Sequence, residues 1–211
     1  MTKIDIEKWN RKKHYLFFKD MTYPLINVNV NVDITNLLKY VKSHHLSFAK
    51  TFLFVTTKAL NSVAEMRMRI RDDEVIMHDI IHPSFTVLGK NEVFHFCEVK
   101  YIDNLFKFSE NAEIAMQKAL IDESLSDEPG RDDYIFVSSL PWFSFNSITH
   151  PINNNKNELS VPRLTWGKYF ESAGKTLIPL SIEVNHALVD GIHIAKFLDA
   201  LNSLSNNIDN E

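Results

Sequence analysis

The sequence predicts an α/β fold, a two-layer sandwich in which helices pack on one mixed β-sheet. Three amphipathic patterns with helical spacing cover residues 35–43, 47–63 and 103–120. Shorter runs rich in β-branched and aromatic residues lie around and between them, and the two kinds of segment are mixed rather than regularly alternating. A chain of 211 residues with 45% hydrophobic content can bury one sizeable core, so we expect a single domain over residues 1–211.

The clearest strand covers residues 26–32. Apolar residues from Ile26 to Val32 alternate there with Asn27, Asn29 and Asn31, which is the period of a half-buried strand. The asparagine face is either exposed to solvent or in contact with another subunit. Further short strands are expected at 75–77, 84–88, 93–99, 134–138 and 164–166. We expect surface loops at 122–133 and 150–157 and a frayed tail at 205–211.

The last strand and the last helix meet at a short junction that carries polar residues. Apolar residues at 180, 182 and 184 alternate with polar ones and predict a strand that ends beside His186. Asp190 follows four positions later, where a helix N-cap is expected, and an apolar helical pattern begins at Ile194. A neutral imidazole at such a junction suits a general base. The alternative is a structural histidine followed by a capping aspartate.

Composition excludes several classes of function. A formal charge of -4 and a pI near 6.1 argue against nucleic-acid binding and favour a small-molecule partner. Cys97 is the only cysteine, which rules out an internal disulfide and a tetrahedral thiolate metal site. The scattered glycines form neither a dinucleotide fingerprint nor a P-loop. No apolar run is long enough to span a bilayer and no secretion signal is evident, so we expect a cytoplasmic protein.

Six segments, taken together and in order, resemble the chloramphenicol acetyltransferase family. Residues 178–193 resemble its histidine segment, and residues 9–14 its W-x-R-x-x-H stretch. Similar matches are R-M-x-x-x-D at 67–72, a strand at 82–87, S-x-x-P-W at 138–142 and P-x-x-T-x-x-K-Y at 162–169. The resemblance implies that fold, a homotrimer with active sites between subunits, and acetylation of chloramphenicol, which inactivates the antibiotic. Acetyl-CoA would be a co-substrate, with no permanently bound cofactor and no metal.

The resemblance also assigns catalytic roles. His186 would take the proton of the acceptor hydroxyl while the oxygen attacks the thioester directly in a ternary complex. Ser138 would donate to the oxyanion and Thr165 would help through a water. Asp190 would pair with Arg11 in a structural role that holds the loop of His186.

Binding roles follow in the same way. Lys168 and Tyr169 match a pair near the adenosine end of CoA, and Phe18 and Phe94 match aromatic contacts to chloramphenicol. Arg163 replaces a residue that is usually apolar, so it needs a carboxylate or a water as partner, or it selects a polar or anionic acceptor.

Two other positions depart from the family pattern. Residues 47–50 lack a ring and a charge expected for CoA binding, and Asn185 replaces a histidine that should point away from the reaction. Arg163 and residues 47–50 leave open a CoA-dependent acyltransferase for a different hydroxyl or amine, and the non-enzyme alternative is a binding or scaffold domain without catalysis. His193 lacks companion ligands, so a metal role is disfavoured.

Overall fold

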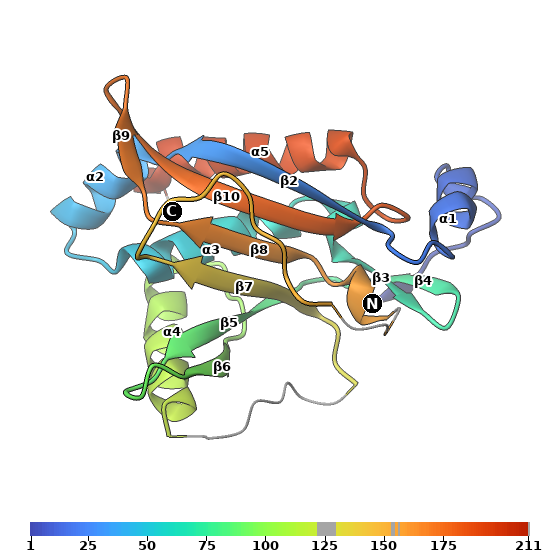
Figure 1. Ribbon diagram of the computed structural model, residues 1–211, viewed down its shortest axis with the longest axis horizontal. Helices are drawn as coiled ribbons and strands as arrows, with labels where there is room; N and C mark the ends of the chain where they lie inside the picture. Colours follow the sequence, from blue (N-terminus) through green and yellow to red (C-terminus); the bar gives the residue numbers. More distant parts are fainter. Residues whose placement is uncertain (122–129, 153–154, 156, 211) are drawn as a thin grey trace.

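The computed structural model describes residues 1–121, 130–152, 155 and 157–210, and its main feature is a seven-stranded mixed sheet (Figure 1). The strand order is β2-β10-β8-β7-β5-β6, with β9 paired to β10. The pairs β5–β7 and β7–β8 are parallel and the others antiparallel. The strands of this sheet are β2 (Leu25–Asp33), β5 (His82–Leu88), β6 (Phe94–Glu98), β7 (Tyr134–Leu140), β8 (Arg163–Gly167), β9 (Phe170–Ser172) and β10 (Lys175–Asn185).

A second, three-stranded sheet has the order β1-β4-β3. Its strands are β1 (Thr2–Lys3), β3 (Met68–Arg71) and β4 (Glu74–Met77). The helices are α1 (Lys12–Phe18), α2 (Thr35–Ser43), α3 (Phe48–Asn61), α4 (Leu105–Ala119) and α5 (Gly191–Asn206), with short 3-10 turns at Ala64–Arg67, Glu158–Ser160 and Ile208–Asn210.

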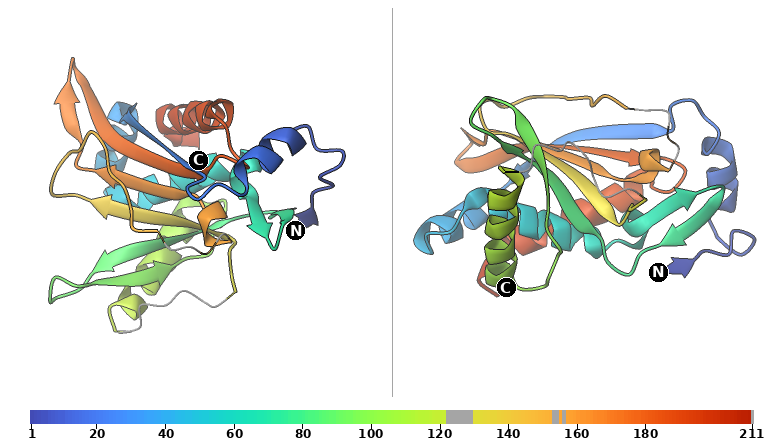
Figure 2. Two further views of the ribbon diagram at one scale, coloured as in Figure 1. Left: turned by 45° about the vertical axis from the view of Figure 1, so that its right-hand side comes forward. Right: turned by 90° about the horizontal axis from the view of Figure 1, so that it is seen from below.

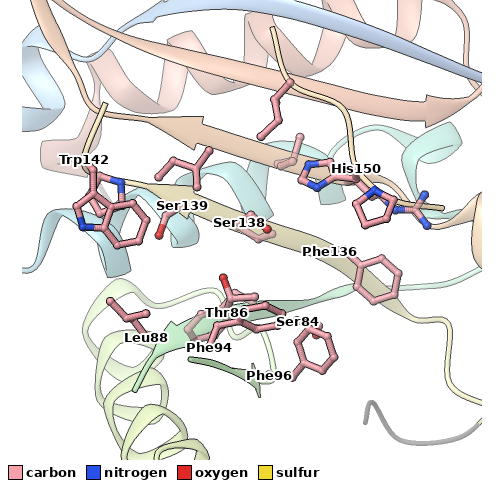
Figure 3. A pocket seen from close by; sticks show the side chains of 18 of the residues that line it. Ser84, Thr86, Leu88, Phe94, Phe96, Phe136, Ser138, Ser139, Trp142 and His150 are labelled. Carbon is pink, nitrogen blue, oxygen red and sulfur yellow. The ribbon is translucent and has the colours of Figure 1, made fainter. Parts of the chain in front are cut away.

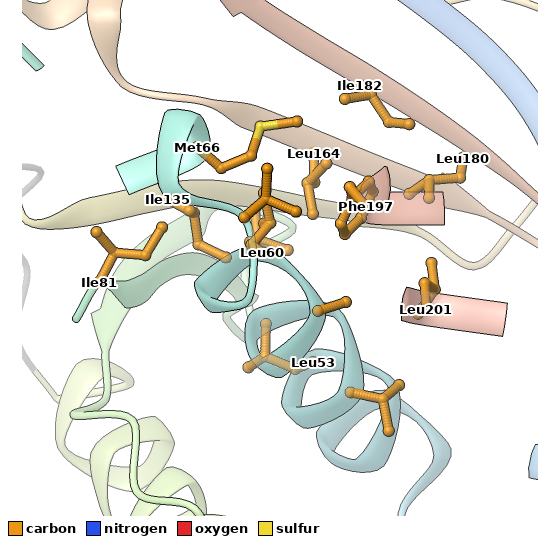
Figure 4. Packing of buried hydrophobic residues seen from close by; sticks show 14 of the residues in the cluster. Leu53, Leu60, Met66, Ile81, Ile135, Leu164, Leu180, Ile182, Phe197 and Leu201 are labelled. Atoms are coloured by element: carbon orange, nitrogen blue, oxygen red, sulfur yellow. The ribbon is translucent and has the colours of Figure 1, made fainter. Parts of the chain in front are cut away.

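Helices cover one face of the large sheet, and the segment that follows β7 crosses the other face (Figure 2). Apolar side chains of α3 and α5 fill the helix layer, with Leu53 and Leu60 from α3 and Phe197 from α5 (Figure 4). They pack against the inward residues Ile135 of β7 and Leu164 of β8 (Figure 4). Burial of these side chains against a mixed sheet confirms the predicted two-layer α/β class.

The predicted helices and strands are confirmed with small shifts at their ends. The pattern at 35–43 is α2, and Ser47 is the N-cap of α3, where its hydroxyl accepts from the Lys50 amide. The side chain of Asn104 caps α4 in the same way. The predicted N-cap at Asp190 is also confirmed, since its carboxylate accepts from the Gly191 amide at 2.7 Å.

The prediction of a frayed tail is wrong for residues 205–210, the part of the tail that the structure describes. Helix α5 continues to Asn206, and the Ile208 side chain is buried in the core. Of the two predicted surface loops, residues 122–129 and 153, 154 and 156 lie outside the described part of the chain. Within the described part, His150 is half-buried and hydrogen-bonded to β8, so this loop reaches the interior. Among the described residues, no helix combines the length and apolar content that crossing a bilayer requires.

A fully buried arginine joins the two sheets. The guanidinium of Arg69 on β3 donates to the main-chain oxygens of Met66, Met68, Asp132 and Tyr134. Burial lowers the pKa of Arg69 to about 10. This side chain therefore supplies hydrogen-bond donors to several main-chain carbonyls, most of them buried.

Replacing Arg69 by Met is expected to lower the free energy of unfolding by at least about 3 kcal/mol, because it leaves these carbonyls without a donor. Urea denaturation followed by circular dichroism measures the loss. Arg67→Met is the matched control, since the half-buried Arg67 guanidinium donates to His78 O and Asp79 O and to no other residue that the structure describes. An equal loss in both variants would contradict the role given to Arg69.

Candidate active site

His186 follows the last residue of β10 and is fixed by its main chain and its ring. Its amide donates to Pro24 O at 2.7 Å, and its Nδ1 lies 3.0 Å from Val189 O. A carbonyl accepts hydrogen bonds only, so the contact assigns the proton of the neutral ring to Nδ1. The lone pair is then on Nε2, which is the arrangement a general base requires.

One face of the His186 ring is covered by Phe18 from the end of α1. The two ring centroids lie 4.2 Å apart with an interplanar angle of 34°. Phe17 meets Phe18 edge-on and is itself 67% exposed. The imidazole is half-buried, held between a phenyl ring and the turn at Val189.

Arg11 and Asp190 lie next to His186, as the resemblance implies. Arg11 Nη1 is 3.5 Å from Asp190 Oδ2, and Arg11 Nη2 donates to the main-chain oxygen of His186 at 3.2 Å. The Gly191 amide and the Arg11 charge lower the pKa of Asp190. The long ion pair is weak by itself, but Arg11 ties α1 directly to the backbone of His186.

A cavity of about 830 Å³ lies on the sheet face opposite the helices, over β5, β6, β7 and β8 (Figure 3). Ser138 lines it near the middle, with Leu88 and Trp142 toward one end and Phe136 and His150 toward the other (Figure 3). Phe94 also lines this cavity. Ser139, the next residue along β7, lines it as well.

Thr165 pairs with Ser138 in the parallel register of β7 and β8, yet its side chain is fully buried. Its hydroxyl lies 2.7 Å from His150 Nε2. Burial lowers the pKa of His150, so its ring is uncharged near neutral pH. The sequence predicts that His150 lies in a surface loop. In the structure its side chain instead lies between Thr165 and the cavity. No pattern around residue 150 indicates this contact.

Arg163 lines the same cavity and is met by two carboxylates. Its Nη2 is 3.6 Å from Glu158 Oε1, its Nη1 is 3.8 Å from Glu183 Oε1, and its guanidinium lies over the Phe136 ring at 5.7 Å. The sequence predicts that the Arg163 guanidinium needs a carboxylate or a water as partner, and the structure gives it two carboxylates. The sequence did not indicate that Glu183 would be one of them. At these distances Arg163 Nη1 and Glu183 Oε1 form no hydrogen bond.

Lys168 and Tyr169 follow β8, beyond the end of the cavity near Trp142. The Lys168 amide donates to Phe143 O at 2.9 Å, and the Tyr169 ring meets Phe48 of α3 edge-on. A small hollow of about 90 Å³ lies beside the N-terminal turn of α3, and it shares Ser139 with the large cavity. Lys50, which lines this hollow, is paired with Glu113 at 2.8 Å.

Seven of the predicted site residues thus form two groups within one chain, and Thr165, Lys168 and Tyr169 lie outside both. Phe18, Arg11 and Asp190 surround His186, whereas Ser138, Phe94 and Arg163 line the cavity. His186 does not line the cavity that Ser138 lines. His193 accepts from the Asp190 amide through Nδ1 at 2.9 Å, so it caps α5. Among the described residues, no cluster of His, Cys, Asp and Glu could hold a metal ion.

Comparisons with known proteins agree on one family. The family model for chloramphenicol acetyltransferase matches residues 1–202. A chloramphenicol acetyltransferase of Escherichia coli is 33% identical over 95% of this chain and 91% of its own length. One of Clostridium perfringens is 34% identical over 97% of this chain and 94% of its own length.

Solved structures agree on the fold. A chloramphenicol acetyltransferase superposes with a TM-score of 0.84 at 24% identity, covering 95% of this chain and 97% of that one. A dihydrolipoamide acetyltransferase of Azotobacter vinelandii superposes with a TM-score of 0.71 at 18% identity, covering 95% and 87% of the two chains. At these identities the likeness concerns the fold alone.

Proposed function

This chain belongs to the chloramphenicol acetyltransferase family and is an acyltransferase, and from that premise we propose that it moves the acetyl group of acetyl-CoA to a hydroxyl of chloramphenicol. The observation that carries the proposal for this chain is the fixed imidazole of His186, with Nδ1 held by Val189 O and Nε2 left as a base. The family match extends over the segments that supply both this imidazole and the cavity.

The proposed reaction needs no acyl-enzyme. His186 Nε2 takes the hydroxyl proton as the acceptor oxygen attacks the thioester carbonyl, and the carbonyl oxygen becomes an oxyanion. The Ser138 hydroxyl donates to that oxyanion. The C–S bond then breaks, and the CoA thiolate leaves and recovers the proton from the imidazolium. Cys97 is no nucleophile for this reaction, since burial raises the pKa of its thiol to about 12.

We further propose that each site is completed by a second subunit in a homotrimer. Apolar side chains lie exposed on α1 and in the segment that leads to Pro24, whose carbonyl accepts from the His186 amide: Leu16, Phe17, Met21 and Tyr23. A cluster of this kind beside a catalytic group is typical of an interface. In a closed ring, each subunit would present His186 to the cavity of one neighbour and receive His186 from the other.

For the donor, we propose that CoA reaches Ser138 from the end of β8. Lys168 supplies a cation for phosphate there, and the exposed Tyr169 ring supplies a flat surface for adenine. Lys50 is already paired with Glu113, so we do not assign it to CoA. Acetyl-CoA is a metabolite of the cytoplasm, and the proposal places the enzyme there.

The test is release of free CoA thiol by purified protein, followed with a thiol reagent. Release that requires both acetyl-CoA and chloramphenicol is expected. The buried Cys97 thiol adds no background, because its raised pKa keeps it protonated. Release only with other alcohols or amines would support an acyltransferase for a different acceptor. No release with any acceptor would support the binding-domain alternative and overturn the proposal.

A further inference from the structure

We propose that the cavity selects its acceptor by charge: the end around Arg163 is dominated by carboxylates and favours an amphipathic alcohol with a cationic group there over one with a carboxylate. This inference rests on the proposed function, because it concerns the acceptor side of the same site. The simplest expectation for an arginine in a binding cavity is that it selects an anionic ligand, and we propose the opposite preference.

The cavity has two chemically different ends (Figure 3). Leu88, Phe94 and Trp142 make one end apolar, and they suit a hydrocarbon or aromatic body. The other end, beyond Ser138, carries Glu158 and His150 with Arg163. An acceptor that fills the cavity therefore needs an apolar part and a polar part, with its reacting hydroxyl near Ser138 between them.

In the described part of the chain, the charged groups that meet at the polar end are the cation of Arg163 and the carboxylates of Glu158 and Glu183. Arg163 is 8% exposed and already faces two carboxylates, Glu158 and Glu183. An incoming anion would have to approach both of them to reach the guanidinium. His150 adds no compensating charge, because burial lowers its pKa. The second carboxylate of the described lining, Glu92, lies in the turn between β5 and β6, beside Leu88 and Phe94, and so at the other end of the cavity.

The two carboxylates act on a ligand in different ways. The Glu158 side chain is 35% exposed, so it is accessible to an ammonium group that enters the cavity. The Glu183 side chain is 1% exposed and makes no direct contact with a ligand, but its field acts through a poorly screened interior. In the proposed trimer, a neighbouring subunit would bring its Arg11 and Asp190 close to this cavity together with His186. Because these two side chains pair with each other, they would add no net charge to the cavity.

The test uses analogues of chloramphenicol whose aromatic ring carries trimethylammonium, nitro or carboxylate at one position. A second set carries a cationic, neutral or anionic group on the amide side instead, so that either orientation in the cavity is covered. Binding is measured by quenching of tryptophan fluorescence, since Trp142 lines the cavity. In at least one set, the cationic analogue is expected to bind at least about ten-fold more tightly than the anionic one.

Glu158→Gln should reduce that ratio to less than about three-fold, because it removes the accessible carboxylate and keeps its shape. Glu74→Gln is the matched control, since Glu74 pairs with Lys3 on the small sheet and the substitution changes the net charge equally. A carboxylate analogue that binds as well as the cationic one in both sets would overturn the proposal. So would a ratio that Glu158→Gln leaves unchanged. Because binding is measured without turnover, these results are separate from failure of the acetyl transfer itself.

Discussion

Replacing His186 by alanine is expected to lower kcat about 10²- to 10⁴-fold, with acetyl-CoA binding little changed, because the variant removes the base and leaves the donor site intact. The imidazole is half-buried, and among the described residues its ring is hydrogen-bonded to Val189 O alone, so the fold should persist. Steady-state CoA release and light scattering measure the two properties. His186→Ala with normal turnover would remove the basis of the proposed mechanism.

His193 offers a matched control for this experiment. It is also a histidine near Asp190, but its Nδ1 accepts from the Asp190 amide at the start of α5. His193→Ala should therefore reduce stability by about 1 kcal/mol through the lost cap, with kcat close to that of the wild type. A fall in kcat equal to that of His186→Ala would mean that both variants act by disturbing the same loop.

Helices and strands whose apolar residues repeat with a clear period could be predicted from the sequence. The alternating strand predicted at 26–32 is β2, and the helices α2, α3 and α4 were also predicted, because their apolar residues repeat at the spacing of the structure. Helix α1 and strand β3 were missed. Helix α1 is seven residues long and buries only Tyr15, and β3 buries Arg69, a residue type that normally indicates a surface.

For the site, the sequence indicated residue types but not their contacts. The N-cap role of Asp190 depends on neighbours in the chain and was predicted. The partner of His186 Nδ1 is a main-chain oxygen, set by the turn and carrying no residue signature. The contacts of Arg163 with Glu183 and of Thr165 with His150 join distant segments. The first depends on the register of β8 and β10 and the second on the path of the loop before β8, and neither leaves a local pattern in the sequence.

Replacing Ser138 by alanine is expected to lower kcat about 10²- to 10³-fold, because the oxyanion loses one preorganised donor. The KM for chloramphenicol should change little, since the hydroxyl is proposed to act in the transition state. Ser139→Ala is the matched control, because Ser139 lines the same cavity one residue away on β7. Equal losses in the two variants would argue against a specific role for Ser138.

Mixing the two defective chains tests whether His186 and Ser138 act across a subunit contact. In a cyclic trimer of His186→Ala and Ser138→Ala chains, any mixed ring has one contact where an intact His186 meets an intact Ser138. Random assembly at equal amounts makes about three quarters of the rings mixed, so about one quarter of the wild-type activity should return. The chains must be unfolded and refolded together, with each chain refolded alone as the control. If both residues acted within one chain, every site would lack one of them, and the mixture would stay as inactive as its parts.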